Sequence, residues 1–445
     1  MSNPTKPHRR GRIRRWLRPG TGISGWLLIV FLGQLLLAVA GAIAIRIAFQ
    51  NVPSDSLGGQ LFDLLSLQFL PGLLRPVVVI LIGAGILVYG LRRLMGVLLE
   101  PFPARTEPLV ELVYQKRSLA RGPRVVAVGG GTGLSTLLRG LKETTSNITA
   151  VVTVADDGGS SGKLRKELGI APVGDIRSCI TALADAEPTM TRLLQYRFPA
   201  DEAGEAGLAG HAFGNLLIAA LTDVSGDFEE AVRQSNRVLA VRGSVVPVAG
   251  TPITLHARLD DGSTLEGESH IERAHGIESI WITPEDVRPT EEALTAIGNA
   301  DIVVIGPGSL YTSLLPPLLV PGMREALAAT GAARLFVCNV ATQLGETEGY
   351  GVARHMAALA AHGLSGMIDA VLVNSNTHAR QLPGDPAAPV SLDVEPRRAG
   401  PPMIVSRDVV DDDNAHRHDS RKLSGAILDL YEERTGMRRD PVAAS

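Results

Sequence analysis

The chain has 445 residues, enough for two or three domains, and 45% of them are hydrophobic, which allows a large buried core. Its 43 Lys and Arg residues nearly balance its 46 Asp and Glu residues, and the net charge of -3 argues against a strongly basic nucleic-acid-binding protein. Two cysteines, Cys179 and Cys338, are too few for a disulfide framework and favour a reducing compartment.

The N-terminal part predicts a membrane anchor. A basic tail over residues 1–25 precedes an apolar run, Trp26 to Ile45, whose roughly 20 positions match the thickness of a bilayer core. A second apolar segment lies between about Phe69 and Leu91, so we expect a two-helix transmembrane hairpin over residues 26–93. The alternative for the first run is a cleaved signal peptide. The run is longer than the usual hydrophobic region of such a peptide, and a second span follows it.

Basic residues around this hairpin predict its orientation. Arginines crowd the N-terminal tail and more basic residues follow the second span, so the positive-inside rule places both ends in the cytoplasm. Residues 94–122 then form a linker, residues 123–435 the large domain, and residues 436–445 a tail. We therefore expect a multi-pass cell-membrane protein with both termini and the large domain on the cytoplasmic side.

From residue 123 onward, short β-rich runs alternate with helical stretches. The runs that predict strands are Val125–Val128, Ile148–Ala155, Asp301–Ile305, Arg334–Asn339 and Ala370–Asn374. The predicted helices include Ile176–Ala184, Phe213–Leu221 and Phe228–Leu239. This alternation predicts an α/β fold, a doubly wound, Rossmann-like parallel sheet with helices on both faces. The segment Val245–Ile271 alternates apolar and polar residues around Asp261-Gly262, so we expect a small antiparallel insertion there.

The most informative stretch is VVAVGGGTGLSTLL, residues 125–138, in which a buried strand breaks into glycines and resumes at helical spacing. Unpaired N–H groups and the positive dipole end at a helix N-terminus bind anions, usually phosphates. We therefore expect a nucleotide or sugar phosphate to contact Gly129, Gly130, Gly131, Thr132 and Gly133. The alternative is a tight turn without a ligand, and the glycine spacing does not match the dinucleotide-binding fingerprint.

A second glycine-rich loop, ADDGGSSGKLR, follows the second predicted strand. Its candidate ligand-binding residues are Gly158, Ser160, Ser161, Lys163 and Arg165, joined by Arg177 further along the chain. The adjacent carboxylates of Asp156 and Asp157 favour metal binding or proton transfer over simple turn capping. Asp175 is either a further functional carboxylate or a helix N-cap. We expect Mg²⁺ as a cofactor, held by Asp157 and Asp175.

A third loop, GPGSLYTS, follows the strand at Asp301–Ile305 and supplies Gly308, Ser309 and Thr312 as ligand-binding candidates. Asn339 follows the next strand, and Asn215 lies in a predicted helix four residues after His211. Because the loops end strands of one parallel sheet, they fit one crevice at the strand carboxyl ends. The candidate catalytic residues are Asp156, Asp157, Asp175 and His211.

A cluster near the C-terminus has the composition of a metal site. Its members are Asp411, Asp412, Asp413, His416, His418 and Asp419. We favour a solvated acidic loop in which Asp419 caps a helix from about Leu423 to Glu433.

Six motifs in order carry a family resemblance. They are VVAVGGGTGLSTLLRGLK, TVADDGGSSGKLRKELG, PVGDIRS, GHAFGNLLIAAL, ADIVVIGPGSLYTSLLP and CNVATQLGET. Over nearly all of residues 123–433 they resemble the YvcK-type gluconeogenesis factors, within the broader family of the CofD phospholactate transferases. Two positions depart from the pattern, because Ala212 stands where serine is expected and Cys179 where asparagine is usual.

The resemblance implies a CofD-like domain that binds a nucleotide diphosphate compound. In the YvcK-type branch the implied ligand is a UDP-sugar such as UDP-N-acetylglucosamine, and the implied role is control of cell shape and envelope synthesis during gluconeogenic growth. We therefore expect a membrane-tethered nucleotide-sugar sensor, with a second copy of the chain and cell-wall synthesis proteins as partners and no nucleic acid. The alternative is a transferase of the 2-phospho-L-lactate transferase type, acting on a nucleotide diphosphate ester. A NAD-dependent dehydrogenase ranks below both, because we find no acid or base for hydride transfer.

Overall fold

The computed structural model describes residues 117–185, 188–199, 207–381, 387–394 and 402–436, together with scattered positions between residues 32 and 90. The predicted hairpin, linker and tails therefore lie wholly or largely outside the described residues. Within the described part of the chain, no helix combines the length and the apolar character needed to cross a membrane. Residues 118–445 form one of two units of the chain, and the fold below is that of this unit alone.

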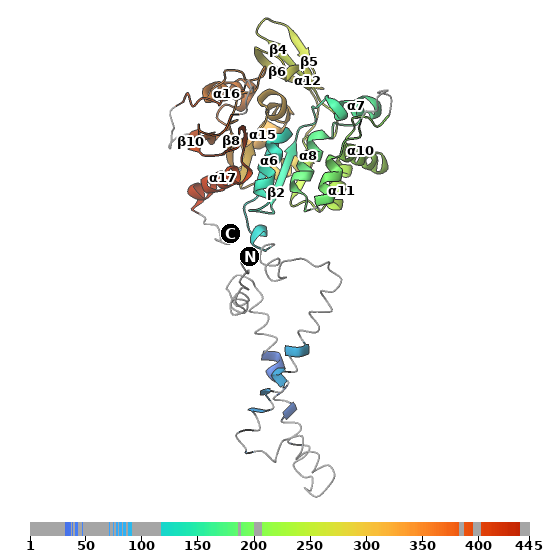
Figure 1. Ribbon diagram of the computed structural model, residues 1–445, viewed down its shortest axis with the longest axis vertical. Helices are drawn as coiled ribbons and strands as arrows, with labels where there is room; N and C mark the ends of the chain where they lie inside the picture. The colour runs from blue at the N-terminus through green and yellow to red at the C-terminus, as the bar shows by residue number, and fades with distance from the viewer. Residues whose placement is uncertain are drawn as a thin grey trace, which may run out of the picture. The chain divides into compact units, whose positions relative to one another are not determined.

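A seven-stranded parallel sheet forms the centre of the domain, in the order β10-β9-β8-β7-β1-β2-β3 (Figure 1). Its strands are β1 (Val125–Gly129), β2 (Ile148–Val152), β3 (Ser244–Pro247), β7 (Ile302–Ile305), β8 (Ala333–Val337), β9 (Ala370–Asn374) and β10 (Met403–Arg407). In the register, Val125 pairs with Ile148 on one side and with Ile302 on the other. The central strands are apolar along their whole length because both of their faces are covered.

The order of the strands reverses at β1. From β1 the chain passes outward through β2 to β3, returns to β7 beside β1, and passes outward again through β8 and β9 to β10. Because crossovers between parallel strands are right-handed, the helices of the two halves cover opposite faces of the sheet. The predicted doubly wound α/β fold is confirmed. Its topological switch point lies between the carboxyl ends of β1 and β7, where such sheets bind ligands.

Helices cover both faces of this sheet. They are α6 (Gly131–Leu141), α7 (Gly159–Leu168), α8 (Gly174–Leu183), α9 (Pro188–Gln195), α10 (Phe213–Ser225), α11 (Phe228–Val238), α13 (Glu291–Gly298), α14 (Leu315–Leu319), α15 (Met323–Ala329), α16 (Val352–Leu359) and α17 (Ser420–Thr435). The short helix α12 (Glu268–Ile271) packs on the antiparallel insertion. Two π-helical turns, η1 (Leu310–Leu314) and η2 (Ala360–Leu364), precede α14 and follow α16. The predicted helices are present as α8, α10, α11 and α17.

Helix α6 connects the core to the last helix of the domain. Leu134, Leu137, Leu138 and Leu141 are fully buried, and each stabilises the fold by about 1.5–3 kcal/mol relative to an exposed position. On its other side α6 packs so closely on α17 that a Cβ at Gly140 would lie 1.9 Å from the carbonyl oxygen of Ser420. Residue 140 therefore has to be glycine for these helices to meet.

The predicted antiparallel insertion is present, but its limits differ from those expected. A three-stranded sheet, β5-β4-β6, contains β4 (Thr254–Leu259), β5 (Thr264–Glu266) and β6 (Ile277–Thr283), and lies at the top of Figure 1. The prediction that the insertion begins at Val245 is wrong, because Val245 and Val246 belong to β3. Both are buried in β3, at the edge of the parallel sheet, whereas an alternating strand would expose one of them.

Candidate functional site

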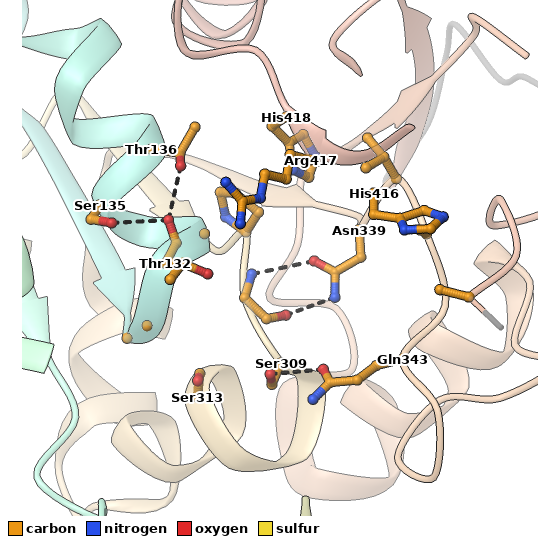
Figure 2. Close-up of a pocket in the computed structure, with 18 of the residues that line it drawn as sticks. Thr132, Ser135, Thr136, Ser309, Ser313, Asn339, Gln343, His416, Arg417 and His418 are labelled. Carbon is orange, nitrogen blue, oxygen red and sulfur yellow. Dashed lines mark hydrogen bonds between the residues drawn. The ribbon is translucent and has the colours of Figure 1, made fainter. Parts of the chain in front are cut away.

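A cavity of about 520 Å³ lies at the switch point of the sheet (Figure 2). Its walls come from the loops after β1, β7 and β8, and from strand β12 (Asn414–His418), which pairs with the short strand β11 (Val410–Asp411). The predicted ligand-binding residues that line it are Gly130, Gly131, Thr132, Gly133, Gly308, Ser309 and Asn339. The volume is typical of a small-molecule site.

The N-terminus of α6 forms one wall of this cavity. Gly131 has a φ of +68°, a conformation that glycine adopts readily, and no side chain caps the helix at Gly130. A Cβ at Gly133 would lie 2.6 Å from the carbonyl oxygen of Pro307, so glycine at 133 lets the loops after β1 and β7 meet. An uncapped first turn with its positive dipole end favours an anion at this position.

Hydrogen bonds between side chains and backbone brace the cavity walls (Figure 2). The hydroxyls of Ser135 and Thr136 both donate to the carbonyl oxygen of Thr132, at 3.0 and 2.9 Å. The Asn339 amide accepts from the Gly308 N–H at 3.3 Å and donates to the Gly308 carbonyl at 2.8 Å. Asn339 therefore ties the loop after β8 to the loop after β7, and the cavity has a preformed shape.

Arg139 of α6 and Arg417 of β12 bring positive charge to the cavity. Among the described residues, neither guanidinium has a hydrogen bond or ion pair, so both are available to an anion. His416 and His418 also line the cavity. Burial lowers the pKa of His418 to about 4 despite a hydrogen bond with the Cys338 backbone, so its ring is neutral at physiological pH.

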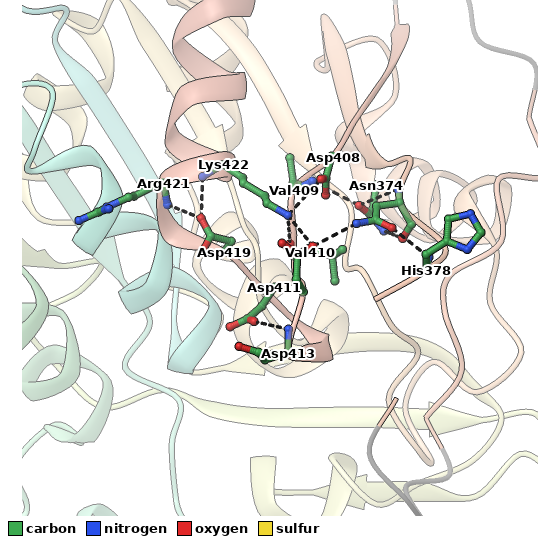
Figure 3. Close-up of polar contacts among 12 residues, drawn as sticks. Asn374, His378, Asp408, Val409, Val410, Asp411, Asp413, Asp419, Arg421 and Lys422 are labelled. Atoms are coloured by element: carbon green, nitrogen blue, oxygen red, sulfur yellow. Dashed lines mark hydrogen bonds and ion pairs between the residues drawn. The ribbon is translucent and has the colours of Figure 1, made fainter. Parts of the chain in front are cut away.

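The acidic residues before and after β12 have structural roles (Figure 3). The Lys422 Nζ donates to Asp408 at 3.0 Å, to Asp412 at 2.8 Å and to the Val410 carbonyl at 3.1 Å. Asp419 caps α17 as predicted, accepting from the N–H groups of Arg421 and Lys422 at 2.9 and 2.7 Å. The prediction of a solvated loop is wrong for His416 and His418, because both lie in strand β12, where His416 is half-buried and His418 is buried.

Four carboxylates lie beside the α6 N-terminus but outside the cavity lining: Asp156, Asp157, Asp175 and Glu268. We call them the acidic cluster. A Cβ at Gly130 would lie 2.3 Å from an Asp175 carboxylate oxygen, so Gly130 borders both regions. Asp175 is half-buried, and desolvation together with the charge of Asp156 raises its pKa to about 6, although a hydrogen bond from the Gly131 backbone opposes the rise.

Sequence reasoning missed Glu268, which comes from α12 in the insertion and carries no motif. Burial raises its pKa well above the ordinary value, and the charges of Asp175, Asp156 and Asp157 raise it further. Its Oε2 atom is buried without a hydrogen-bond partner. Such an atom needs a proton or a cation, because an unpaired buried charge is strongly unfavourable.

The predicted Mg²⁺ site has suitable chemistry but lacks a formed ligand set. Carboxylate oxygens are the ligands that Mg²⁺ prefers. However, no group of three or more His, Cys, Asp or Glu side chains among the described residues is placed to hold a metal ion. Two of the oxygens also have protein donors: the Gly158 N–H donates to Asp156 at 2.8 Å, and the Ser269 N–H donates to Asp157 at 2.9 Å.

Several predicted ligand-binding residues contact other parts of the protein. Lys163 donates to the Ala209 carbonyl at 3.3 Å, and Arg165 donates to the Ile253 carbonyl and the Thr254 hydroxyl at 2.9 and 2.7 Å. Thr312 is buried, and its N–H donates to the buried carboxylate of Glu346 at 3.0 Å. Burial raises the pKa of Glu346 to about 7. The carboxylate of Glu346 thus occupies the position at the start of η1 where an external anion was expected.

The remaining candidates also lie outside the cavity lining. They are Gly129 at the buried end of β1, Gly158 and Ser161 at the start of α7, the hydrogen-bonded group of Ser160, His211 and Asn215, and Arg177 of α8. Ser161 hydrogen-bonds Asp156 and so helps to close the second glycine-rich loop on itself. Arg177 is half-buried and has no hydrogen bond or ion pair within the described residues.

Comparison with known proteins identifies the family. The profile described as 2-phospho-L-lactate transferase CofD matches residues 125–410. The chain belongs to the CofD family. The chain is 44% identical to the gluconeogenesis factor of Bacillus subtilis strain 168 over 321 residues, which cover 71% of this chain and 100% of that protein. The gluconeogenesis factor of Halalkalibacterium halodurans is 47% identical over 311 residues, covering 68% of this chain and 95% of that protein.

Two further comparisons concern the fold and the N-terminal segment. A crystal structure of a protein from Bacillus halodurans shares 43% identity with a TM-score of 0.62, and covers 69% of this chain and 100% of that chain. A relative from Nostoc sp. is 44% identical over 441 residues, 97% of this chain and 95% of its own length. The Nostoc match therefore includes the segment that precedes the CofD-family domain. The predicted membership of the YvcK-type group is confirmed.

Proposed function

We propose that this CofD-family domain binds a nucleotide-sugar such as UDP-N-acetylglucosamine in its cavity, and that it regulates gluconeogenic carbon use, cell shape and envelope synthesis. The observation that carries the proposal is the uncapped N-terminus of α6 at the switch point, with Arg139 and Arg417 in the same cavity. The naming of close relatives as gluconeogenesis factors supports the regulatory role.

The charges and donors of the cavity match a diphosphate compound. In this proposal the pyrophosphate lies against Thr132 and Gly133, where backbone N–H groups and the helix dipole favour negative charge. The two guanidinium groups neutralise the remaining charge. Ser313 and Gln343, which line the same cavity, would then meet the hydroxyl groups of the ribose or the sugar.

We further propose that residues 26–93 tether the domain to the cytoplasmic face of the cell membrane, where it acts as a homodimer on cell-wall synthesis proteins. The two apolar runs and their basic flanks support this proposal. The expected outcome of cell fractionation is that the chain sediments with membranes and is released by detergent but not by high salt. Recovery of the full-length chain in the soluble fraction would contradict the tether.

Isothermal titration calorimetry on the detergent-solubilised full-length protein tests ligand binding. We expect saturable heat with UDP-N-acetylglucosamine, which is lost in Gly131→Asp because a carboxylate then occupies the anion position. Arg237→Gln on the exposed end of α11 is the matched control and should bind normally. The absence of saturable heat with every UDP-sugar and nucleoside diphosphate tried would overturn the proposal.

The acidic cluster favours a second candidate function, transfer of a phosphoester group from a nucleotide diphosphate ester to an alcohol. The bond between the two phosphoryl groups would break, a new phosphorus–oxygen bond to the acceptor would form, and a carboxylate such as Asp156 would take the acceptor proton. Mg²⁺, held by Asp157 and Asp175, would neutralise charge on the phosphates. Incubation with a guanosine diphospholactate donor, a deazaflavin acceptor and Mg²⁺ should release GMP, and its absence would exclude this reaction.

A further inference from the structure

Ser160 is the centre of a buried hydrogen-bonded group. Its hydroxyl oxygen lies 3.0 Å from the Asn215 Nδ2, 3.3 Å from the Ala212 backbone nitrogen and 3.1 Å from the His211 Nδ1. All three side chains involved are at least nine-tenths buried. The group joins the start of α7 to the start of α10, two elements that sequence reasoning treated as separate parts of the site.

The donors and acceptors around Ser160 fix the tautomer of His211. A hydroxyl has one proton to donate and two lone pairs that accept. The Asn215 amide and the Ala212 N–H are both donors, so they use the two lone pairs of the Ser160 oxygen. The hydroxyl proton then points at His211, and the Nδ1 atom must accept it. The neutral His211 ring therefore carries its own proton on Nε2.

The Nε2 atom of His211 is the free end of this arrangement. It has no hydrogen-bond partner among the described residues. It is also not fully buried, unlike the Glu268 Oε2 atom, so it is in contact with solvent. The backbone holds the residue in place, because its N–H donates to Leu208 at 3.0 Å and its carbonyl accepts from Phe198 at 3.0 Å. The ring is thus a fixed group with one outward N–H.

The surroundings of His211 favour a negatively charged partner. The stem of Arg177 packs on the first turn of α10, since a Cβ at Gly214 would lie 2.9 Å from both Cγ and Cδ of that arginine. Its half-buried guanidinium has no hydrogen bond within the described residues, and its charge interacts with that of Arg197 and with the carboxylates of Asp175 and Asp156. Phosphate or carboxylate oxygens satisfy such groups best.

We propose that His211 donates a hydrogen bond from Nε2–H to an anionic oxygen of the bound ligand, and that Ser160 is the positioning residue that sets this tautomer. His211 is then not a general base, because a protonated Nε2 has no lone pair to accept a proton. The inference rests on the proposed function, since the anionic oxygen is one of the pyrophosphate oxygens of the nucleotide diphosphate compound.

The tautomer is measured on the ligand-free full-length protein. Long-range ¹H–¹⁵N correlation spectra of the ¹⁵N-histidine protein, recorded above pH 8, should give the Nε2–H pattern for His211, assigned by its disappearance in His211→Gln. An Nδ1–H pattern would overturn the role given to Ser160, whatever ligand the protein binds.

The ligand contact is measured by calorimetry with UDP-N-acetylglucosamine and with inorganic pyrophosphate. Glutamine places an amide N–H near the Nε2 position, whereas asparagine places one near Nδ1. We expect His211→Gln to bind within about threefold of wild type, and His211→Asn and His211→Ala to bind about tenfold more weakly. Ser160→Ala should weaken binding in the wild-type background and add no further loss in His211→Ala.

These outcomes separate the inference from the proposed function. Equal affinities of wild type, His211→Asn and His211→Ala for a probe that binds would overturn the ligand contact and leave the proposed function standing. Failure of wild type to bind any probe would overturn the proposed function and the ligand contact together, whereas the tautomer spectrum still decides the role of Ser160. Urea unfolding of all variants shows whether an affinity loss follows from lost stability.

Discussion

The cavity and the acidic cluster lie on either side of Gly130 and differ in what their glycine-rich loops leave unsatisfied. In the cavity, α6 begins without a side-chain cap, and two arginines have no partner among the described residues. In the acidic cluster, Asp156 accepts hydrogen bonds from Gly158 and Ser161 of its own loop. The first region therefore has spare donors and positive charge, and the second has spare acceptors and negative charge.

This difference shows that a glycine-rich loop after a strand predicts a turn more reliably than a ligand site. The loop after β7 makes the same point, because the buried carboxylate of Glu346 occupies the donors of Tyr311 and Thr312. Whether such a loop binds an external anion depends on carboxylates that come from elsewhere in the chain. Glu346 and Glu268 are both remote in sequence from the loops that they affect.

The largest expected effect is that of Gly133→Val. The new side chain would collide with the Pro307 carbonyl and force the loops after β1 and β7 apart. We expect at least a hundredfold loss of affinity for UDP-N-acetylglucosamine, and about 1–3 kcal/mol lower free energy of unfolding. Gly425→Ala in α17 is the control, because a Cβ there has open space around it. Unchanged binding in Gly133→Val would show that the loops do not form the site.

The second prediction tests the acidic cluster through Asp175→Asn. The pKa of Asp175 is about 6 in the fold against 3.8 unfolded. Its stability contribution is therefore fully present below pH 3.8 and is lost as the pH rises through 6. The difference between these two pKa values corresponds to about 3 kcal/mol. The variant should thus be more stable than wild type at pH 8 by about that amount and equal to it near pH 4, as measured by urea unfolding.

Asp301→Asn is the control of opposite sign for this experiment. A hydrogen bond from Arg124 lowers the pKa of Asp301, so its contribution is present above the unfolded pKa and is lost as the pH falls. Because the Arg124 side chain is 58% exposed, we expect a loss of no more than about 1 kcal/mol at pH 7. A lower free energy of unfolding for Asp175→Asn than for wild type at pH 8 would show that burial of the ionised Asp175 carboxylate does not destabilise the fold.

Arg417→Gln should weaken ligand binding without affecting stability, unlike the substitution of an arginine that has a structural role. Its guanidinium lines the cavity without a protein partner, so the substitution should leave stability unchanged. Loss of a hydrogen bond to a charged group corresponds to about 1.5–3 kcal/mol, or about 10- to 100-fold in affinity for the UDP-sugar. Equal affinities of the variant and wild type by calorimetry would exclude Arg417 from the site.

The smallest expected effect is that of Arg165→Gln. Arg165 joins α7 to the insertion through Ile253 and Thr254, and it lies outside the cavity lining. We expect a stability loss of about 1 kcal/mol in urea unfolding and unchanged affinity. A tenfold loss of affinity at full stability would place Arg165 at the ligand and remove the distinction between the two regions.

Strand and helix periodicity predicted most of the fold, because buried parallel strands and amphipathic helices have strong local signals. The same local reading misplaced Val245 and Val246, since two adjacent valines fit either kind of strand until their neighbours are known. In the site, the glycines of the loop after β1 were recognisable from their spacing. Arg417 was not, because β12 brings it to the cavity through tertiary pairing and no motif marks it. His418 was noticed only as part of the Asp- and His-rich cluster near the C-terminus, and nothing local in the sequence places it at the cavity.

The wall that β12 contributes to the cavity bears on how the protein is synthesised. The ribosome makes the loop after β1 early and His416, Arg417 and His418 far later, so a nascent chain can form most of its parallel sheet before it has a complete binding site. Nucleotide-sugars would therefore not assist the early stages of folding. They would bind, and stabilise by mass action, only chains whose translation has passed the last strand.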